Sequence, residues 1–146
     1  MPGSWRSRVS RAAPRLLALL WAAYDGSRAL AYLDTSPPQL SSVGEWMPLW
    51  IPWALATVLL ILGGLAPPQA GRRPQRVARL MRQYGTTITT ALLLVWGAAF
   101  LISDFDRGWV SAVSYLMLAC FSGWSGWIAS RHVADVRAVR EGDISA

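Results

Sequence analysis

The chain has 146 residues, of which 53% are hydrophobic and only 15% are charged. A soluble domain usually has about 25% charged residues, so this composition argues against a water-soluble fold. The formal net charge is +6 and every basic residue is an arginine. These arginines lie beside apolar stretches, where they favour anionic lipid headgroups, so we expect no nucleic-acid partner.

Four apolar stretches follow one another along the chain. Each approaches or exceeds the roughly 20 residues that a helix needs to cross a hydrocarbon core. Because backbone groups in lipid must be paired within the segment, each stretch is predicted to be a helix. They cover about 16–33, 48–66, 85–103 and 108–130. The sequence therefore predicts an all-α, integral membrane four-helix transmembrane bundle with short loops, forming a single membrane domain over 1–146.

The first stretch is interrupted by polar residues, among them Asp25 and Arg28. A charge at mid-bilayer costs roughly 2.5–3.5 kcal/mol and usually marks function, so these two residues form a candidate intramembrane polar pair. Three interpretations are open. In the first, the charges of Asp25 and Arg28, three residues apart, neutralise each other. In the second, the stretch is a signal peptide that is cleaved near Ala29–Ala31. In the third, its polar groups line a pore or drive oligomerisation.

Tryptophans gather at the ends of the second and fourth stretches. An indole combines an apolar body with one N–H donor and favours the headgroup level of a bilayer. We therefore predict interfacial anchors at Trp46, Trp50, Trp53, Trp109, Trp124 and Trp127.

An arginine-rich segment, 72–84, joins the second and third stretches. Its apolar residues Val77, Leu80, Met81 and Tyr84 recur at helical spacing, and the arginines are expected to face away from them. This pattern predicts an amphipathic cytoplasmic loop that lies on the anionic inner leaflet before the chain turns into the third stretch. The lipid-facing basic residues of this loop would be Arg72, Arg73, Arg76, Arg79 and Arg82. A docking face for a cytoplasmic partner is the alternative.

Hydroxyl and small side chains occur at intervals along the third and fourth stretches, and Gly63-Gly64 lies in the second. Such residues let helices approach closely and form hydrogen bonds across the contact. We expect most of them to pack the bundle, with self-association between copies as the alternative. The hydroxyl residues are Thr86, Thr87, Thr89, Thr90, Ser111, Ser114, Ser122 and Ser125. After the fourth stretch, the helix is expected to continue into a cytoplasmic tail, 131–146.

The distribution of arginines also predicts the orientation. The N-terminal segment and the connection 67–84 contain several arginines and no acidic residue, whereas the connections 34–47 and 104–107 contain acidic residues and at most one arginine. The positive-inside rule therefore puts both termini and the connection 67–84 in the cytoplasm.

No residue pattern indicates a catalytic or metal-binding site. The chain has one histidine, His132, and no lysine, and no two acidic residues share the interior of a stretch. A nucleophile–base pair or a histidine-containing metal site would need residues that are missing here. We expect no enzyme activity, no catalytic or metal-binding residue, no cofactor and no small-molecule substrate. The expected partners are the lipid bilayer and further copies of the chain.

In size, in its four apolar stretches, in its arginine-only basic ends and in its lack of enzymatic motifs, the chain resembles holin-like small membrane proteins of actinobacterial phages. The resemblance covers the layout of the whole chain. It implies multi-pass insertion in the cytoplasmic membrane of a bacterial host, followed by self-association that permeabilises or depolarises this membrane.

Two other function classes are open. One is a non-enzymatic accessory or exclusion protein that binds another membrane protein. The other is a small multidrug-type transporter, since these proteins also have four spans. They place a glutamate in the first span, where this chain has Asp25, and an aspartate neutralised by Arg28 would be a poor proton-coupling site.

Overall fold

A computed structural model describes residues 3–34, 37–40, 47–66, 72–103 and 105–142. Side chains are described for 12–34, 37–38, 40, 47–66, 73–103 and 108–128. The elements are α1 (Gly3–Ala31), a 3-10 turn η1 (Pro38–Leu40), α3 (Trp50–Leu65), α4 (Arg72–Ser103) and α5 (Phe105–Gly142). No strand occurs in these ranges, so the all-α prediction is confirmed for the part of the chain that is described.

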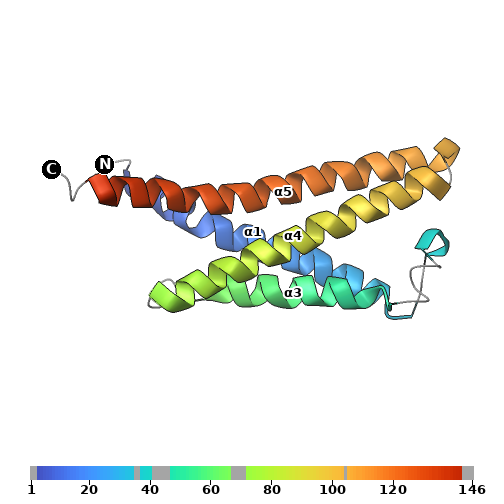
Figure 1. Ribbon diagram of the computed structural model, residues 1–146, viewed down its shortest axis with the longest axis horizontal. Coiled ribbons are helices and arrows are strands. Elements are labelled where there is room, and N and C mark those ends of the chain that lie inside the picture. Colours follow the sequence, from blue (N-terminus) through green and yellow to red (C-terminus); the bar gives the residue numbers. More distant parts are fainter. Residues whose placement is uncertain (1–2, 35–36, 41–46, 67–71, 104, 143–146) are drawn as a thin grey trace.

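Consecutive long helices run in opposite directions and pack in chain order, α1 on α3, α3 on α4 and α4 on α5, as Figure 1 shows. The start of α1, the junction from α3 to α4 and the end of α5 lie at one end of the bundle. We call it the arginine end, because Arg15, Arg73, Arg76, Arg79 and Arg82 are found there. The connections from α1 to α3 and from α4 to α5 lie at the opposite end.

Two helix boundaries differ from the predicted ones. The expected turn between the amphipathic segment 72–84 and the stretch 85–103 does not occur, because α4 is one continuous helix. Gly85 causes no break, since it has no positive φ and packs against α3. The first helix, α1, begins at Gly3, well before the predicted start of the first stretch at about 16, and Pro14 lies inside it. The predicted continuation of the last helix into the tail is confirmed by α5, although the side chains of this tail lie outside the described residues.

One helix segment of the described chain, Arg73–Ser103, is long and apolar enough to cross a membrane by length and composition. It contains the third predicted span. The second, α3, is strongly apolar but has 16 residues. Length and composition therefore support a membrane-spanning helix at α4.

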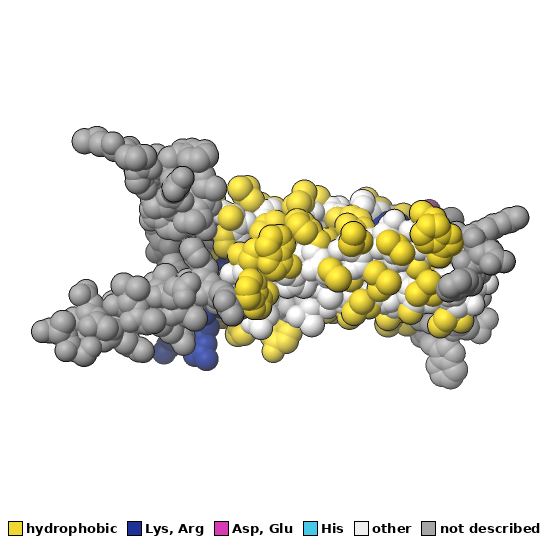
Figure 2. Space-filling view, turned by 90° about the horizontal axis from the view of Figure 1, so that it is seen from above, with side chains coloured by type: hydrophobic (Ala, Val, Ile, Leu, Met, Phe, Trp, Pro, Cys, Tyr) yellow, Lys and Arg dark blue, Asp and Glu magenta, His cyan; other side chains and the backbone are white. Residues whose placement is uncertain are grey.

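Large apolar side chains lie on the outside of the bundle as well as in its mostly apolar core. Large apolar residues are exposed along all four helices, and they cover much of the face in Figure 2 between the undescribed ends. The polar residues Asp25, Thr86, Thr89, Ser122 and Ser125 are buried between the helices. Water-soluble proteins bury apolar residues and rarely expose large contiguous apolar patches. Exposed apolar surface of this kind is typical of contact sites for membranes or for other proteins.

Small residues set the distances between the helices. A Cβ added to Gly63 would lie 2.8 Å from the Ala78 carbonyl oxygen on α4, and one added to Gly64 would lie 2.9 Å from Leu19 Cδ2 on α1. Contacts this short do not occur, so Gly63 permits an approach of the α4 backbone that alanine would prevent, whereas alanine at Gly64 would require the Leu19 side chain to move. The expectation that Gly63-Gly64 packs the bundle is confirmed.

The indole of Trp53 contradicts its predicted role as an interfacial anchor. Its side chain is 0% exposed and its ring lies edge-on against Tyr24 and Trp96. Because α3 packs on both α1 and α4, the first turn of α3 already lies within the bundle. The tryptophans at the other predicted anchor positions within the described residues are exposed, namely Trp50, Trp109, Trp124 and Trp127; Trp46 lies outside them.

Candidate functional site

A carboxyl group is buried inside the bundle. The Asp25 side chain, on α1, is 0% exposed, and the Thr89 hydroxyl on α4 donates a hydrogen bond of 2.6 Å to its Oδ2. The second oxygen, Oδ1, has no hydrogen-bond partner. The Thr89 hydroxyl also lies 3.0 Å from the Gly85 carbonyl oxygen. A buried polar atom without a partner is costly, so Asp25 lowers the stability of the folded bundle.

Asp25 and Arg28 do not neutralise each other, which corrects the paired interpretation. The Arg28 Nε donates to the Tyr24 hydroxyl at 3.2 Å. Its Cζ lies 5.3 Å from the Tyr24 ring centroid and 5.4 Å from that of Tyr115, within the range of cation–π attraction. The short carboxyl faces α4, whereas the long guanidinium side chain reaches aromatic rings. Each residue therefore has its own partners.

Hydroxyl groups continue the polar interior from Asp25 towards the arginine end. Thr90 donates to the Ser122 hydroxyl at 3.1 Å, which joins α4 to α5. The Trp21 indole on α1 lies 3.4 Å from the Ser125 hydroxyl on α5. These contacts connect three helices through side chains, and they confirm the expected packing role of these hydroxyl residues. We call the five buried residues Asp25, Thr86, Thr89, Ser122 and Ser125 the polar core.

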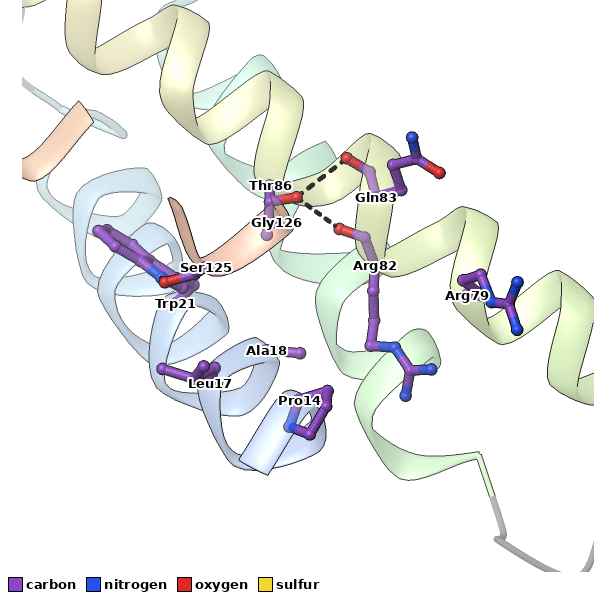
Figure 3. A pocket seen from close by; sticks show the side chains of 10 residues that line it. All are labelled: Pro14, Leu17, Ala18, Trp21, Arg79, Arg82, Gln83, Thr86, Ser125 and Gly126. Carbon is purple, nitrogen blue, oxygen red and sulfur yellow. Dashed lines mark hydrogen bonds between the residues drawn. The ribbon is translucent and has the colours of Figure 1, made fainter. Parts of the chain in front are cut away.

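A hollow opens beside the polar core at the arginine end, between α1, α4 and α5 (Figure 3). Its lining residues are Pro14, Leu17, Ala18, Trp21, Arg79, Arg82, Gln83, Thr86, Ser125 and Gly126. Arg82 Nη1 donates to the Gly63 carbonyl oxygen at 3.1 Å, while its Nε is shielded from solvent and has no hydrogen-bond partner. The hollow therefore combines positive charge with an apolar wall.

Arg82 faces away from Val77, Leu80 and Tyr84 as predicted, but it packs against the neighbouring helices, which the amphipathic pattern of 72–84 did not predict. Because α4 is continuous, the row Ala78, Arg82, Gly85 and Thr89 lies on one face, and this face contacts α3 and α1. Arg73 and Arg76 are exposed as expected, Arg79 is partly buried and lines the hollow, and the Arg72 side chain lies outside the described residues. Val77, Leu80 and Tyr84 are exposed on the outer surface.

The sequence prediction missed the roles of Thr89 and Arg82. Thr89 was treated like the other threonines and Arg82 like the other arginines of the same segment. The helical spacing that puts both of them on one face with Ala78 and Gly85 is the signal that distinguishes them. The side chains described contain no cluster of three or more metal-ligating residues. Cys120 is exposed.

α1 supplies a large part of the interior, which bears on the signal-peptide interpretation. Ala18, Trp21, Ala22 and Asp25 are all buried against the other helices. Cleavage near Ala29–Ala31 would remove them and expose the polar faces of α4 and α5.

No protein-family model, no curated protein and no solved structure matches the chain.

Proposed function

We propose that the protein is an integral membrane protein whose four long helices all cross the bilayer. The observation that supports this proposal is the outer surface of the bundle, where large apolar side chains are exposed along all four long helices while Asp25 and four hydroxyl residues are buried inside. At 1.5 Å per residue, the 29 residues of α1 and the 38 of α5 exceed the thickness of a hydrocarbon core of about 30 Å. The 16 residues of α3 reach most of the way across.

The arginine end is proposed to lie in the cytoplasm. The up-and-down arrangement brings the start of α1, the α3–α4 junction and the end of α5 to this end, which agrees with the charge asymmetry of the sequence. The proposed location is thus a bacterial cytoplasmic membrane, with both termini inside.

Cysteine labelling in intact cells tests this orientation. In a Cys120→Ser background, a membrane-impermeant maleimide should modify Ser103→Cys, which is exposed at the opposite end, and should leave Gln75→Cys unmodified until the cells are permeabilised. Labelling of Gln75→Cys alone in intact cells would reverse the orientation. Rapid labelling of both variants would contradict the membrane placement.

For the activity, we propose holin-like permeabilisation of the cytoplasmic membrane by self-association. In the closed bundle the polar core faces inward, so a single copy presents lipid with an apolar surface. If the helices of several copies separate and regroup, the same polar faces can line an aqueous lesion while the apolar faces stay in lipid. The buried, incompletely bonded Asp25 lowers the stability of the closed bundle relative to such an open state.

Controlled expression in bacteria with a potential-sensitive dye tests this activity. The unmodified protein should collapse the membrane potential after it has accumulated. The matched variant Asp25→Asn has nearly the same volume and no ionisable group, and it should accumulate equally but depolarise at least tenfold more slowly. No depolarisation by the unmodified protein would contradict the permeabilising activity, and equal rates for both proteins would remove Asp25 from the lesion.

A small proton-coupled transporter is the second candidate. An Asp25 neutralised by Arg28 would couple protons poorly, but the structure gives these two residues different partners. A buried carboxyl group with a free oxygen is a suitable proton site in a transporter. A coupled transporter exchanges ions for a substrate without collapsing the potential, so the same dye measurement distinguishes the two candidates.

A further inference from the structure

A second and larger hollow lies between α4 and α5, which move apart towards the arginine end in Figure 1. Its volume is about 200 Å³. One water needs only about 10–15 Å³ by this measure, so the hollow has room for a group of several heavy atoms. We call it the α4–α5 groove. Its lining includes Thr86, Thr87 and Thr90 from α4 and Gly123, Gly126 and Trp127 from α5.

The three threonine hydroxyls of the α4–α5 groove can accept hydrogen bonds but have no hydrogen left to donate. Thr86 and Thr87 both donate to the Gln83 carbonyl oxygen, at 3.0 and 2.9 Å. The single hydroxyl hydrogen of Thr90 is taken by the Thr86 carbonyl oxygen at 2.8 Å or by the Ser122 hydroxyl at 3.1 Å. Because each hydroxyl oxygen keeps lone pairs, the groove favours a ligand that carries several hydrogen-bond donors.

The walls of the α4–α5 groove fit an ammonium group better than an anion. A primary ammonium has three donors and no acceptor. Trp127 also lines the groove, and tryptophan is the side chain whose ring attracts cations best. None of the described lining residues is charged, so an anion would meet neither a positive charge nor a threonine donor there.

The surface next to the α4–α5 groove indicates that this ammonium belongs to a lipid. Seven residues from Thr87 and from Trp127, in the direction away from the arginine end, the same helix faces carry the exposed side chains of Leu94 and Cys120. A polar hollow near the end of the bundle is thus followed by apolar surface towards its middle, in the order of a headgroup and its acyl chains. The phosphate of such a lipid also balances the ammonium charge, so the arginines nearby do not repel the headgroup.

We propose that the α4–α5 groove binds the primary ammonium headgroup of phosphatidylethanolamine. The ammonium is held by the hydroxyl oxygens of Thr87 and Thr90 beside the Trp127 ring, and the acyl chains extend over Leu94 and Cys120. This proposal rests on the proposed membrane placement and is independent of the permeabilising activity.

Native mass spectrometry of the purified full-length chain in detergent measures the binding of single lipids. Phosphatidylethanolamine is compared with its N-methyl, N,N-dimethyl and choline derivatives, which keep the charge and lose the donors one by one. The affinity should fall with each methyl group and be roughly tenfold or more lower for the choline lipid. Equal affinities across the series would overturn the proposal. Free ethanolamine should not compete, and effective competition by it would overturn the lipid source.

Two variants locate the site in the α4–α5 groove. A Cβ on Gly123 has Thr90 Cγ2 at 3.9 Å as its nearest neighbour, so Gly123→Leu fills the groove without forcing the helices apart. Thr87→Val removes one acceptor. Each variant should lower the affinity for phosphatidylethanolamine roughly tenfold.

Ser114 provides the matched controls, because it is an exposed hydroxyl residue of α5 outside the groove lining and bonds within its own helix. Ser114→Leu and Ser114→Val should change the affinity less than about twofold. Equal losses in groove and control variants, or no loss in Gly123→Leu, would overturn the proposed site.

Flotation with liposomes separates this proposal from the membrane placement on which it rests. The unmodified chain should float with the liposomes and resist extraction by alkaline carbonate. If it does so and shows no preference for phosphatidylethanolamine, only the headgroup site is refuted. If it does not float, the membrane placement is refuted, and the lipid site with it.

Discussion

Replacing Thr89 with valine is expected to destabilise the bundle by about 1–3 kcal/mol, although the two side chains have almost the same shape. The Thr89 hydroxyl is the hydrogen-bond partner of Asp25 Oδ2, and Oδ1 has none. Without Thr89 the buried carboxyl group would therefore be left without a donor. The measurement is unfolding of the purified protein in mixed micelles, followed by circular dichroism.

Thr87→Val is the matched control on the same helix. Thr87 is exposed and bonds to the Gln83 carbonyl oxygen within its own helix, so its replacement should change stability by less than about 0.5 kcal/mol. In an Asp25→Ala background, the cost of Thr89→Val should also fall below about 0.5 kcal/mol, because no carboxyl group remains to be satisfied. An unchanged cost in that background would show that Thr89 acts through packing and not through Asp25.

Linking α4 to α5 by a disulfide is expected to abolish depolarisation. A Cβ on Gly126 would lie 3.6 Å from Thr86 Cβ, within the roughly 3.5–4.5 Å that a disulfide requires. The variant combines Thr86→Cys and Gly126→Cys with Cys120→Ser, since the exposed Cys120 would otherwise link separate copies. If the lesion requires these helices to separate, the oxidised protein should leave the potential intact, and a reductant should restore its collapse.

The two single-cysteine variants, also in the Cys120→Ser background, are the controls for this experiment. They should form no intramolecular link and should depolarise equally with and without oxidant. Full depolarisation by a completely cross-linked protein would contradict opening of the bundle between α4 and α5. In that case the lesion would have to form between intact bundles.

The positions of the long helices followed from local pattern. Runs of apolar residues about as long as a bilayer is thick predict helices, because a helix satisfies its backbone hydrogen bonds within the segment. Asp25 and Arg28 could also be recognised from the sequence, since charged residues are rare within an apolar run. All of these features depend on residues close together in the chain.

The partners of these residues were decided by the tertiary structure. Asp25 bonds to Thr89, 64 positions further along the chain, and not to the nearby Arg28. Trp53 turns into the bundle, and Arg82 donates to the Gly63 carbonyl oxygen on α3. Each outcome depends on how a helix is rotated about its axis. That rotation is determined by close contacts with neighbouring helices, such as those at Gly63 and Gly85, and the periodicity of one helix alone does not specify them.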